Sequence, residues 1–533
     1  MAIGYQYWFA IIIFLISFAT HLALISKGPV TIDCLNLVIN AQATLQTHHL
    51  QYQFGTGYPL MVLLGATFMT VAQWMGITDP VLAVNFIGVL FGSITVLIFY
   101  LLLQDLCDSL TALLASLILL LNPIFLDVSS YGINHAPALC FLLLGIFALL
   151  RFQRSQQRGD LFLSALYLGL MGATRLQDLL LTLPAIIAMF ILGLKPRSLP
   201  IQTPPMRHFL LYGTTIFIII ALFHLPYFVF NHGDYSAQAH NFWQIGLTQN
   251  FQGPISKFLI KSMSYVLQAF SLVGIFCFCA GFLGMAAVNK RLFVFTWLWC
   301  FIPFIFYGNT MTSAPRFYTI LLPAIIIPIS IFLARVMRNK KLFWKVVALT
   351  AFLCIILQPL SKTEETFLRR HHYSLLADYY LWVNKITEPN ATIISCDDNL
   401  FIEYYSKRHT LVKPALVHRH LPPQDLITFK RKLDDLLDNH QPVYITTLVL
   451  DDYDDFLEFR NLMLQNYRLI PQGDMPLEFW YETPFKSFID IYGLVKVEKK
   501  TKSLSSFSKW VPFQGKNSPL NIPSYKRPYA QNT

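Results

Sequence analysis

Eleven apolar runs limit the fold of this chain more than any other feature of its sequence. Each run is long enough, or nearly so, to cross a bilayer as a helix of about 20 residues. Only 13% of the residues are charged, which is about half the share usual in soluble domains. The sequence therefore predicts a polytopic α-helical membrane protein, with runs at 7–26, 81–104, 110–126, 137–152, 161–174, 176–194, 209–230, 263–288, 292–308, 316–337 and 342–360.

Four short basic loops set the expected topology. They fall at 151–158, 195–207, 290–291 and 335–341, and loops rich in Lys and Arg stay on the cytoplasmic side of a membrane. The net charge of +11 comes mostly from these loops and from the last stretch of the chain, so it does not imply a nucleic-acid partner. We expect a cytoplasmic N-terminus and an extracytoplasmic C-terminal part.

The apolar stretch 58–76 needs a separate decision. If it crossed the membrane, Asp33 would lie on the cytoplasmic side. If it lies in the interface as a juxtamembrane helix, Asp33 shares the outer side with 127–136, 231–262 and 309–315. We favour the second arrangement, which gives about eleven transmembrane helices with outer juxtamembrane helices.

The composition changes after Ser361, where charged residues become frequent and apolar runs shrink to strand length. Helical periodicity separates these short runs, as in a small α/β fold. We expect a membrane domain over 1–360, an extracytoplasmic α/β domain over 361–500 and a flexible basic tail over 501–533. The predicted strands are 391–396, 410–416, 443–450 and 488–497, and the predicted helices between them are 400–408 and 423–440.

Asp33 is the only carboxylate between Met1 and Asp79. A carboxylate at the edge of the hydrocarbon region is costly and is usually functional. In a helix that starts near Ile32, Asp33 shares one polar stripe with Asn36 and Asn40. Two interpretations stay open on these residues alone: Asp33 caps that helix, or it acts as a catalytic base.

Four stretches resemble the GT-C superfamily of polyprenyl-phosphate-sugar-dependent glycosyltransferases, and most of all its family 39 and RgtA/B/C/D-like members. The first is similar to that superfamily's first outer loop and joins Asp33, Leu37 and Ala41 to the turn Gly57–Leu60. The others are SSYGINHAP at 129–137, GATRLQDLLLTLP at 172–184 and APRFYTILLPAI at 314–325. The resemblance covers the membrane part and, more loosely, the α/β part.

The resemblance implies an inverting glycosyltransferase, a hexosyl- or pentosyltransferase of the cell envelope, that uses a lipid-linked donor. The donor would be a polyprenyl-phosphate sugar, and the acceptor a glycan, a lipid or a protein at the outer face of a bacterial plasma membrane. Asp33 would be the catalytic base, and Arg316 with Arg175 would bind the donor phosphate. The alternative for the two arginines is that they extend to lipid headgroups at the membrane boundary. The candidate substrate contacts are Asn36, Asn40, Tyr58, Asn134, His135 and Trp243.

This chain departs from the superfamily at its acids. Cys34 stands where the first loop has a second acid, and Asn134 and His135 stand near the place of an acid in the second loop. Divalent cations prefer oxygen-rich sites, so we expect no cofactor and no obligatory metal. The alternatives are a transporter or lipid flippase, and a catalytically degenerate relative that acts as a scaffold.

Overall fold

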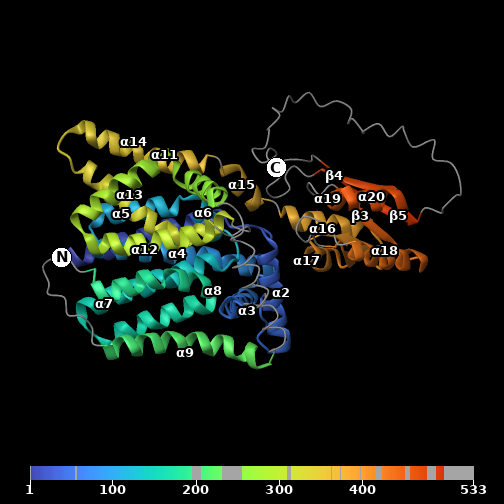
Figure 1. The fold of residues 1–533 in the computed structure, drawn as a ribbon, viewed down its shortest axis with the longest axis horizontal. Coiled ribbons are helices and arrows are strands. Elements are labelled where there is room, and N and C mark those ends of the chain that lie inside the picture. The colour runs from blue at the N-terminus through green and yellow to red at the C-terminus, as the bar shows by residue number, and fades with distance from the viewer. Residues whose placement is uncertain are drawn as a thin grey trace.

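Helices make up most of the chain, and a small sheet lies near its C-terminal end (Figure 1). The computed structural model describes residues 2–53, 57–194, 206–230, 255–308, 314–361, 363–372, 374–396, 398–414, 423–450, 457–476 and 488–496. The predicted fold class is confirmed: a polytopic helical bundle with outer juxtamembrane helices and a small α/β region.

The bundle contains eight described helices that are long and apolar enough to cross a membrane, and a bent pair supplies a ninth crossing. The pair is bent by 65° because Pro123 begins a new helix there, and Asn122 caps that helix through the Ile124 N–H at 3.1 Å. The bundle elements are α1 (Ala2–Ala23), α4 (Pro80–Leu106), α5 (Ser109–Leu120), α6 (Pro123–Ser129), α7 (His135–Ser155), α8 (Arg158–Leu192), α9 (Met206–Phe230), α11 (Ile255–Val288), α12 (Lys290–Gly308), η3 (Pro315–Leu321), α13 (Leu322–Met337) and α14 (Leu342–Leu360).

Helix α8 reverses direction at Arg175, where the sequence shows a gap between two apolar runs. Arg175 leaves helical geometry with φ −153° and ψ 88°. Both ends of α8 lie beside the end of α7: Ser155 donates a hydrogen bond to Asp160 at 2.6 Å, and Gln153 donates one to the Met189 carbonyl at 2.6 Å. The two limbs are therefore antiparallel and cross separately. With α1, the described part of the chain has a helical segment for each of the eleven apolar runs.

One end of the bundle, which we call the basic end, carries the described parts of the basic loops. Two acids that lie among these loops are paired there: Arg154 contacts Asp105 at 2.9 Å, and Arg338 contacts Asp108. Asp105 and Asp108 thus lie at the basic end of the bundle, where each is neutralised by an arginine. The predicted basic loop also includes residues 195–205, which lie outside the described residues.

Two helices, α2 (Ile32–Thr47) and α3 (Pro59–Trp74), lie at the opposite end of the bundle, beside the sheet region (Figure 1). Helix α3 packs against the first turns of α4 around Val84. Just before α3, the Tyr52 hydroxyl donates to the Phe223 carbonyl near the end of α9, at 3.3 Å. Both contacts are at the end away from the basic end, so α3 is a juxtamembrane helix and does not cross the bundle.

Asn85 ties the loops at this end together. Its amide nitrogen donates to the carbonyls of Ser26 at 2.8 Å and Gly28 at 3.1 Å, and its oxygen accepts from the Gly132 N–H at 2.9 Å and from the Cys34 thiol at 3.4 Å. Asn85 is fully buried. One side chain of α4 thus holds the loops that contain Ser26, Gly28 and Gly132 and the first turn of α2, which carries Asp33.

We expect Asn85→Leu to lower the free energy of unfolding by about 2–4 kcal/mol, because the buried Ser26 carbonyl and Gly132 N–H lose the hydrogen bonds that Asn85 makes. The Gly28 carbonyl loses one of two, since it also accepts from the Ser26 hydroxyl. Thermal unfolding of the detergent-purified protein measures this loss. Ser93→Ala, which removes one hydrogen bond to His21 from the same helix, is the matched control and should cost less. If Asn85→Leu is as stable as the control, the hydrogen bonds of Asn85 do not hold these loops together.

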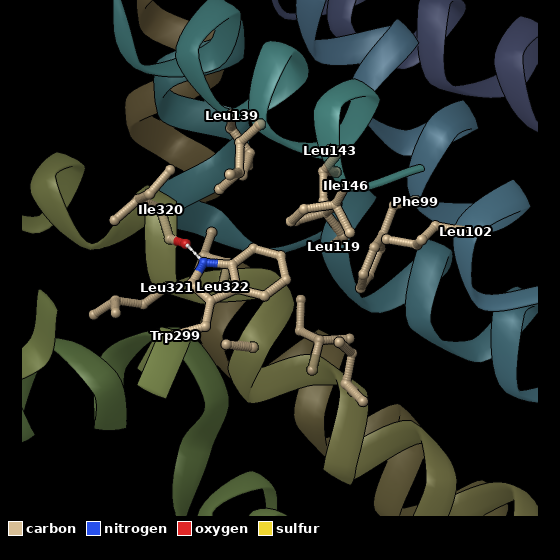
Figure 2. Packing of buried hydrophobic residues seen from close by; sticks show 14 of the residues in the cluster. Phe99, Leu102, Leu119, Leu139, Leu143, Ile146, Trp299, Ile320, Leu321 and Leu322 are labelled. Carbon is tan, nitrogen blue, oxygen red and sulfur yellow. Dashed lines mark hydrogen bonds between the residues drawn. The ribbon is translucent and has the colours of Figure 1, made fainter. Parts of the chain in front are cut away.

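Trp299 of α12 fixes the start of the next crossing. The chain passes there from the 3-10 segment η3 into α13, and the Ile320 carbonyl accepts a hydrogen bond from the Trp299 indole at 2.9 Å. A buried Trp needs such a partner for its N–H. Figure 2 shows the indole within the apolar core, among side chains that include Leu119, Leu139 and Leu143. This core holds η3 in place, and η3 carries Arg316.

The C-terminal region has five strands in the order β2-β1-β3-β5-β4, with β1 parallel to β2 and β3, and β5 antiparallel to β3 and β4. The strands are β1 (Thr392–Ser395), β2 (His409–Val412), β3 (Val443–Thr446), β4 (Tyr467–Pro476) and β5 (Phe488–Lys496). The helical elements are α15 (Glu364–His372), α16 (Leu375–Ile386), α17 (Asn399–Phe401), the short π-helix η4 (Ile402–Ser406), α18 (Pro423–Asp438), α19 (Thr447–Leu450) and α20 (Leu457–Asn466).

The structure differs from the predicted strands in three places. The strand expected over 410–416 is β2, which begins at His409 and ends at Val412. The strand expected over 443–450 ends at Thr446, and Thr447–Leu450 forms the short helix α19, because a short apolar run does not by itself distinguish a strand from a helix. Strand β4 was not predicted from its sequence, which contains Pro471 and Gly473 at an irregularity in its pairing with β5. The tail 501–533 lies outside the described residues.

The sheet region packs directly on the end of the bundle that carries α2. Leu35 of α2 is buried in one cluster with Tyr379 and Tyr380 of α16. Closer to the bundle, Arg370 of α15 contacts Asp127 of α6 at 2.5 Å. These contacts place the α/β region over the helix whose first turn carries Asp33.

Candidate active site

Asp33 and Arg316, 283 residues apart in the sequence, meet at the end of the bundle that the sheet region covers. Arg316 Nη2 lies 3.0 Å from Asp33 Oδ2, and the two side chains are 21% and 30% exposed. A carboxylate and a guanidinium that both reach solvent at a membrane boundary can each contact a substrate. The structure therefore brings together the predicted base and one of the two predicted phosphate ligands.

The first turn of α2 shows how Asp33 is held. Thr31 is the N-cap, and its hydroxyl accepts from the Cys34 N–H at 3.3 Å. The Asp33 carbonyl accepts from the buried Gln53 side chain at 2.6 Å. Since Thr31 does the capping, Asp33 is not needed for it, although a negative charge in the first turn still suits the helix dipole. Its carboxylate is left to pair with Arg316.

Arg175 lies at the reversal of α8 and is almost fully buried, with a side chain 5% exposed. Its Nε donates to Asp178 Oδ2 at 2.7 Å, and its Nη1 donates to the Asn134 side-chain oxygen at 3.1 Å and lies 3.3 Å from His135 Nε2. Tyr307 accepts from Arg175 Nη2 at 3.4 Å and donates to Asp178. Both guanidinium and carboxylate are therefore satisfied within the protein.

Phe317 links this buried cluster to Arg316. The Cζ atoms of Arg316 and Arg175 lie 5.5 Å and 5.6 Å from the centroid of its ring. The Tyr307 ring stacks on it at 5.5 Å, and the His135 ring approaches it edge-on at 5.5 Å. One aromatic side chain thus contacts both predicted phosphate-binding arginines.

The other predicted contacts are divided between these clusters. Asn134 and His135 contact Arg175, and Tyr58 lies within electrostatic range of the same guanidinium. Asn36 and Asn40 are hydrogen-bonded to each other on α2 and are partly buried. Trp243 lies outside the described residues.

Three residues of this site were missed from the sequence: Asp178, Tyr307 and Phe317. Asp178 carried a usable signal, because a carboxylate inside an apolar run marks a functional or paired site by default. Tyr307 and Phe317 carried none, since aromatic side chains are common throughout membrane helices. With Arg175, Asp178 forms a buried ion pair inside the helical bundle.

Cys34 does not replace the missing second acid. It is buried, its thiol donates to Asn85, and burial raises its pKa to about 12. It is therefore a neutral thiol near neutral pH. Within the described residues no group of three or more His, Cys, Asp and Glu side chains could hold a metal ion, and Arg316 already lies against the Asp33 carboxylate that a cation would need.

Comparison with known proteins gives a family match and similar solved structures. A family model described as dolichyl-phosphate-mannose-protein mannosyltransferase matches residues 59–231, which include Asn134, His135 and Arg175 but not Asp33 or Arg316. No curated protein sequence matches the chain.

Two solved structures share the fold over most of the chain. ArnT from Cupriavidus metallidurans, bound to undecaprenyl phosphate, is 11% identical, with a TM-score of 0.57 over 92% of this chain and 97% of that one. The Archaeoglobus fulgidus oligosaccharyltransferase, in complex with zinc and sulfate, is 15% identical, with a TM-score of 0.57 over 86% of this chain and 71% of that one. The chain therefore has the fold of the GT-C superfamily of membrane glycosyltransferases, as its sequence motifs predict.

Proposed function

We propose that this protein transfers a sugar from a polyprenyl-phosphate donor to an acceptor hydroxyl at the α2 end of the bundle. The fold and the family match support a membrane glycosyltransferase. The observation that carries the finer proposal is the partly exposed contact between Asp33 and Arg316 at 3.0 Å. It puts a proton acceptor next to a fixed positive charge, which are the two groups that this reaction requires.

In the proposed reaction, Asp33 accepts the proton of the acceptor hydroxyl as its oxygen attacks the anomeric carbon. The bond from that carbon to the phosphate oxygen breaks, and polyprenyl phosphate leaves with the electron pair. Arg316 stabilises the negative charge on the leaving phosphate, as preorganised cations do. Arg175, which is paired with Asp178, acts indirectly by contacting the Phe317 ring next to Arg316. A single displacement inverts the anomeric configuration.

The Asp33–Arg316 contact also suggests an order of binding. While Arg316 lies on Asp33, the ion pair occupies the carboxylate oxygen that would accept the proton. A donor phosphate offers the guanidinium two oxygens and competes for it. Donor binding would then draw Arg316 away and leave Asp33 available to the acceptor, so the donor would bind before the acceptor is activated.

The proposed setting follows from the two ends of the bundle. We assign the basic end to the cytoplasm, which places the site and the α/β region at the outer face of a bacterial plasma membrane. The acceptor would be a cell-envelope glycan, a lipid or a protein, bound between α2 and the α/β region. Asn36, Asn40 and Tyr58 are proposed contacts because they border Asp33 or Arg175.

A transfer assay tests the function. The purified protein in nanodiscs, which hold no ion gradient, is given undecaprenyl-phosphate sugars and a panel of glycan, lipid and peptide acceptors. We expect release of undecaprenyl phosphate together with a glycosylated acceptor. A transporter or flippase would instead move lipid-linked sugar across proteoliposomes without breaking the sugar–phosphate bond, and that result would reject the proposal.

We expect transfer to be independent of divalent metal. Arg316 supplies the positive charge near the phosphate, and Cys34 offers no second carboxylate for a cation. Activity is measured in the same assay before and after treatment with excess EDTA and after return of Mg²⁺, Mn²⁺ or Zn²⁺. Loss of transfer with EDTA and its recovery with one of these ions would show that a metal takes part.

A further inference from the structure

Phe317 occupies an unusual place for an aromatic side chain, because four polar or aromatic groups meet on its ring. Two of them are the guanidinium groups of Arg316 and Arg175, each within 5.6 Å of the ring centroid. The other two are the Tyr307 ring, stacked with an interplanar angle of 13°, and the His135 ring, at 62°. Aromatic faces carry partial negative charge and attract cations within about 6 Å.

The two guanidinium groups differ in their exposure to solvent. Arg175 is 5% exposed and is bound by Asp178, Asn134 and Tyr307. Arg316 is 21% exposed and contacts the partly exposed carboxylate of Asp33. The buried group and the stacked Tyr307 therefore fix the Phe317 ring, while Arg316 lies at the accessible edge of the assembly.

We infer that Phe317 is a positioning residue that holds the Arg316 guanidinium where a phosphate can bind it. The inference rests on the proposed function, in which Arg316 binds the donor phosphate. Arginine has many rotamers, and ordering such a side chain costs free energy on binding. A fixed ring that attracts the guanidinium lowers that cost, because Arg316 is already confined near its binding position.

The chemistry of the ring makes the inference specific. Leucine fills much of the same space and is apolar, but it has no π face. Tyrosine and tryptophan keep the π face, and tryptophan binds cations best. A packing role would need only the volume, whereas the positioning role needs the aromatic face.

The test compares Phe317→Leu, Phe317→Tyr and the wild-type protein. The control is Phe304→Leu, which removes a partly buried phenyl ring in α12 that contacts Tyr318 edge-on. Thermal unfolding establishes that all variants remain folded. Binding of undecaprenyl phosphate to the detergent-purified proteins is measured first, and then KM and kcat with an undecaprenyl-phosphate sugar.

We expect Phe317→Leu to weaken binding of undecaprenyl phosphate and to raise KM for the donor by about 2- to 30-fold, the range of one cation–π contact. The KM for the acceptor should not change, and Phe317→Tyr should bind as the wild type does. Equal binding by wild type and Phe317→Leu, or an equal loss in Phe304→Leu, would overturn the inference, as would a wild-type protein that does not bind the lipid.

Binding and transfer separate this inference from the proposed function. If the wild type binds undecaprenyl phosphate and the affinity depends on the ring, the positioning role holds even where no sugar is transferred, and it is then the proposed function that fails. If sugar is transferred but Phe317→Leu leaves lipid binding and the donor KM unchanged, the proposed function holds and the positioning role fails.

Discussion

Asp33→Asn should reduce sugar transfer by roughly 10²- to 10⁴-fold, the usual contribution of a general base. The amide keeps the size of the side chain but cannot accept the acceptor proton. The protein should remain folded, because Thr31 rather than Asp33 caps α2 and because exposed ion pairs contribute about 0.2–1 kcal/mol. Transfer is measured with the purified protein, and thermal unfolding reports its stability.

Asp127→Asn is the matched control for this experiment. Asp127 is also a partly buried acid at the α2 end of the bundle and also contacts an arginine, Arg370, at 2.5 Å. It lies at the junction with the α/β region, and its carboxylate pairs with Arg370 rather than with Arg316 or Arg175. We expect this variant to retain transfer. Wild-type transfer by Asp33→Asn would remove Asp33 from the mechanism.

Donor binding provides a second signature of the same variant. Asp33 competes with phosphate for Arg316, so Asp33→Asn should bind undecaprenyl phosphate as tightly as the wild type or up to about fivefold more tightly, given the strength of an exposed ion pair. Arg316→Ala should lose affinity instead. If both variants lose transfer but only Arg316→Ala loses lipid binding, Asp33 is the base and Arg316 is the phosphate ligand.

The membrane part of the fold was largely predictable because apolar length and loop charge are local properties of the sequence. Each of the eleven runs corresponds to a helical segment, and even the short runs on either side of Arg175 form separate limbs of α8. The interfacial position of α3 followed from topology alone: a crossing there would have placed its loops on the wrong side. Length and sign of charge are sufficient for such conclusions.

The site was predictable only in part, because contacts across the bundle leave no local pattern. Asp33, Arg316 and Arg175 stood out as charges at the ends of apolar runs. That Arg175 is bound to Asp178 and Tyr307, rather than open to solvent, depends on how α8 and α12 pack. Strand β4 could not be predicted for a similar reason. It is a strand because it pairs with β5, and not because apolar and polar residues alternate along it.

The Arg175–Asp178 pair allows a test that separates stability from function. Both side chains are at most 5% exposed, so Asp178→Leu alone would leave a buried guanidinium without its counter-ion. Loss of one partner of a buried ion pair costs about 3–5 kcal/mol. We expect a correspondingly large fall in the thermal stability of Asp178→Leu. Asp105→Leu, at the exposed pair with Arg154, is the control and should cost less than about 1 kcal/mol.

The double variant Arg175→Met/Asp178→Leu should recover most of that stability, because apolar side chains of similar size often replace a buried ion pair without loss. It should not recover donor binding, since the Phe317 ring loses the guanidinium that helps to fix it and Tyr307 loses its carboxylate acceptor. A stable double variant with weakened binding of undecaprenyl phosphate would show that the buried pair serves the site. Full recovery of both would show that it serves only the fold, and continued instability would mean that the reversal of α8 itself depends on these charges.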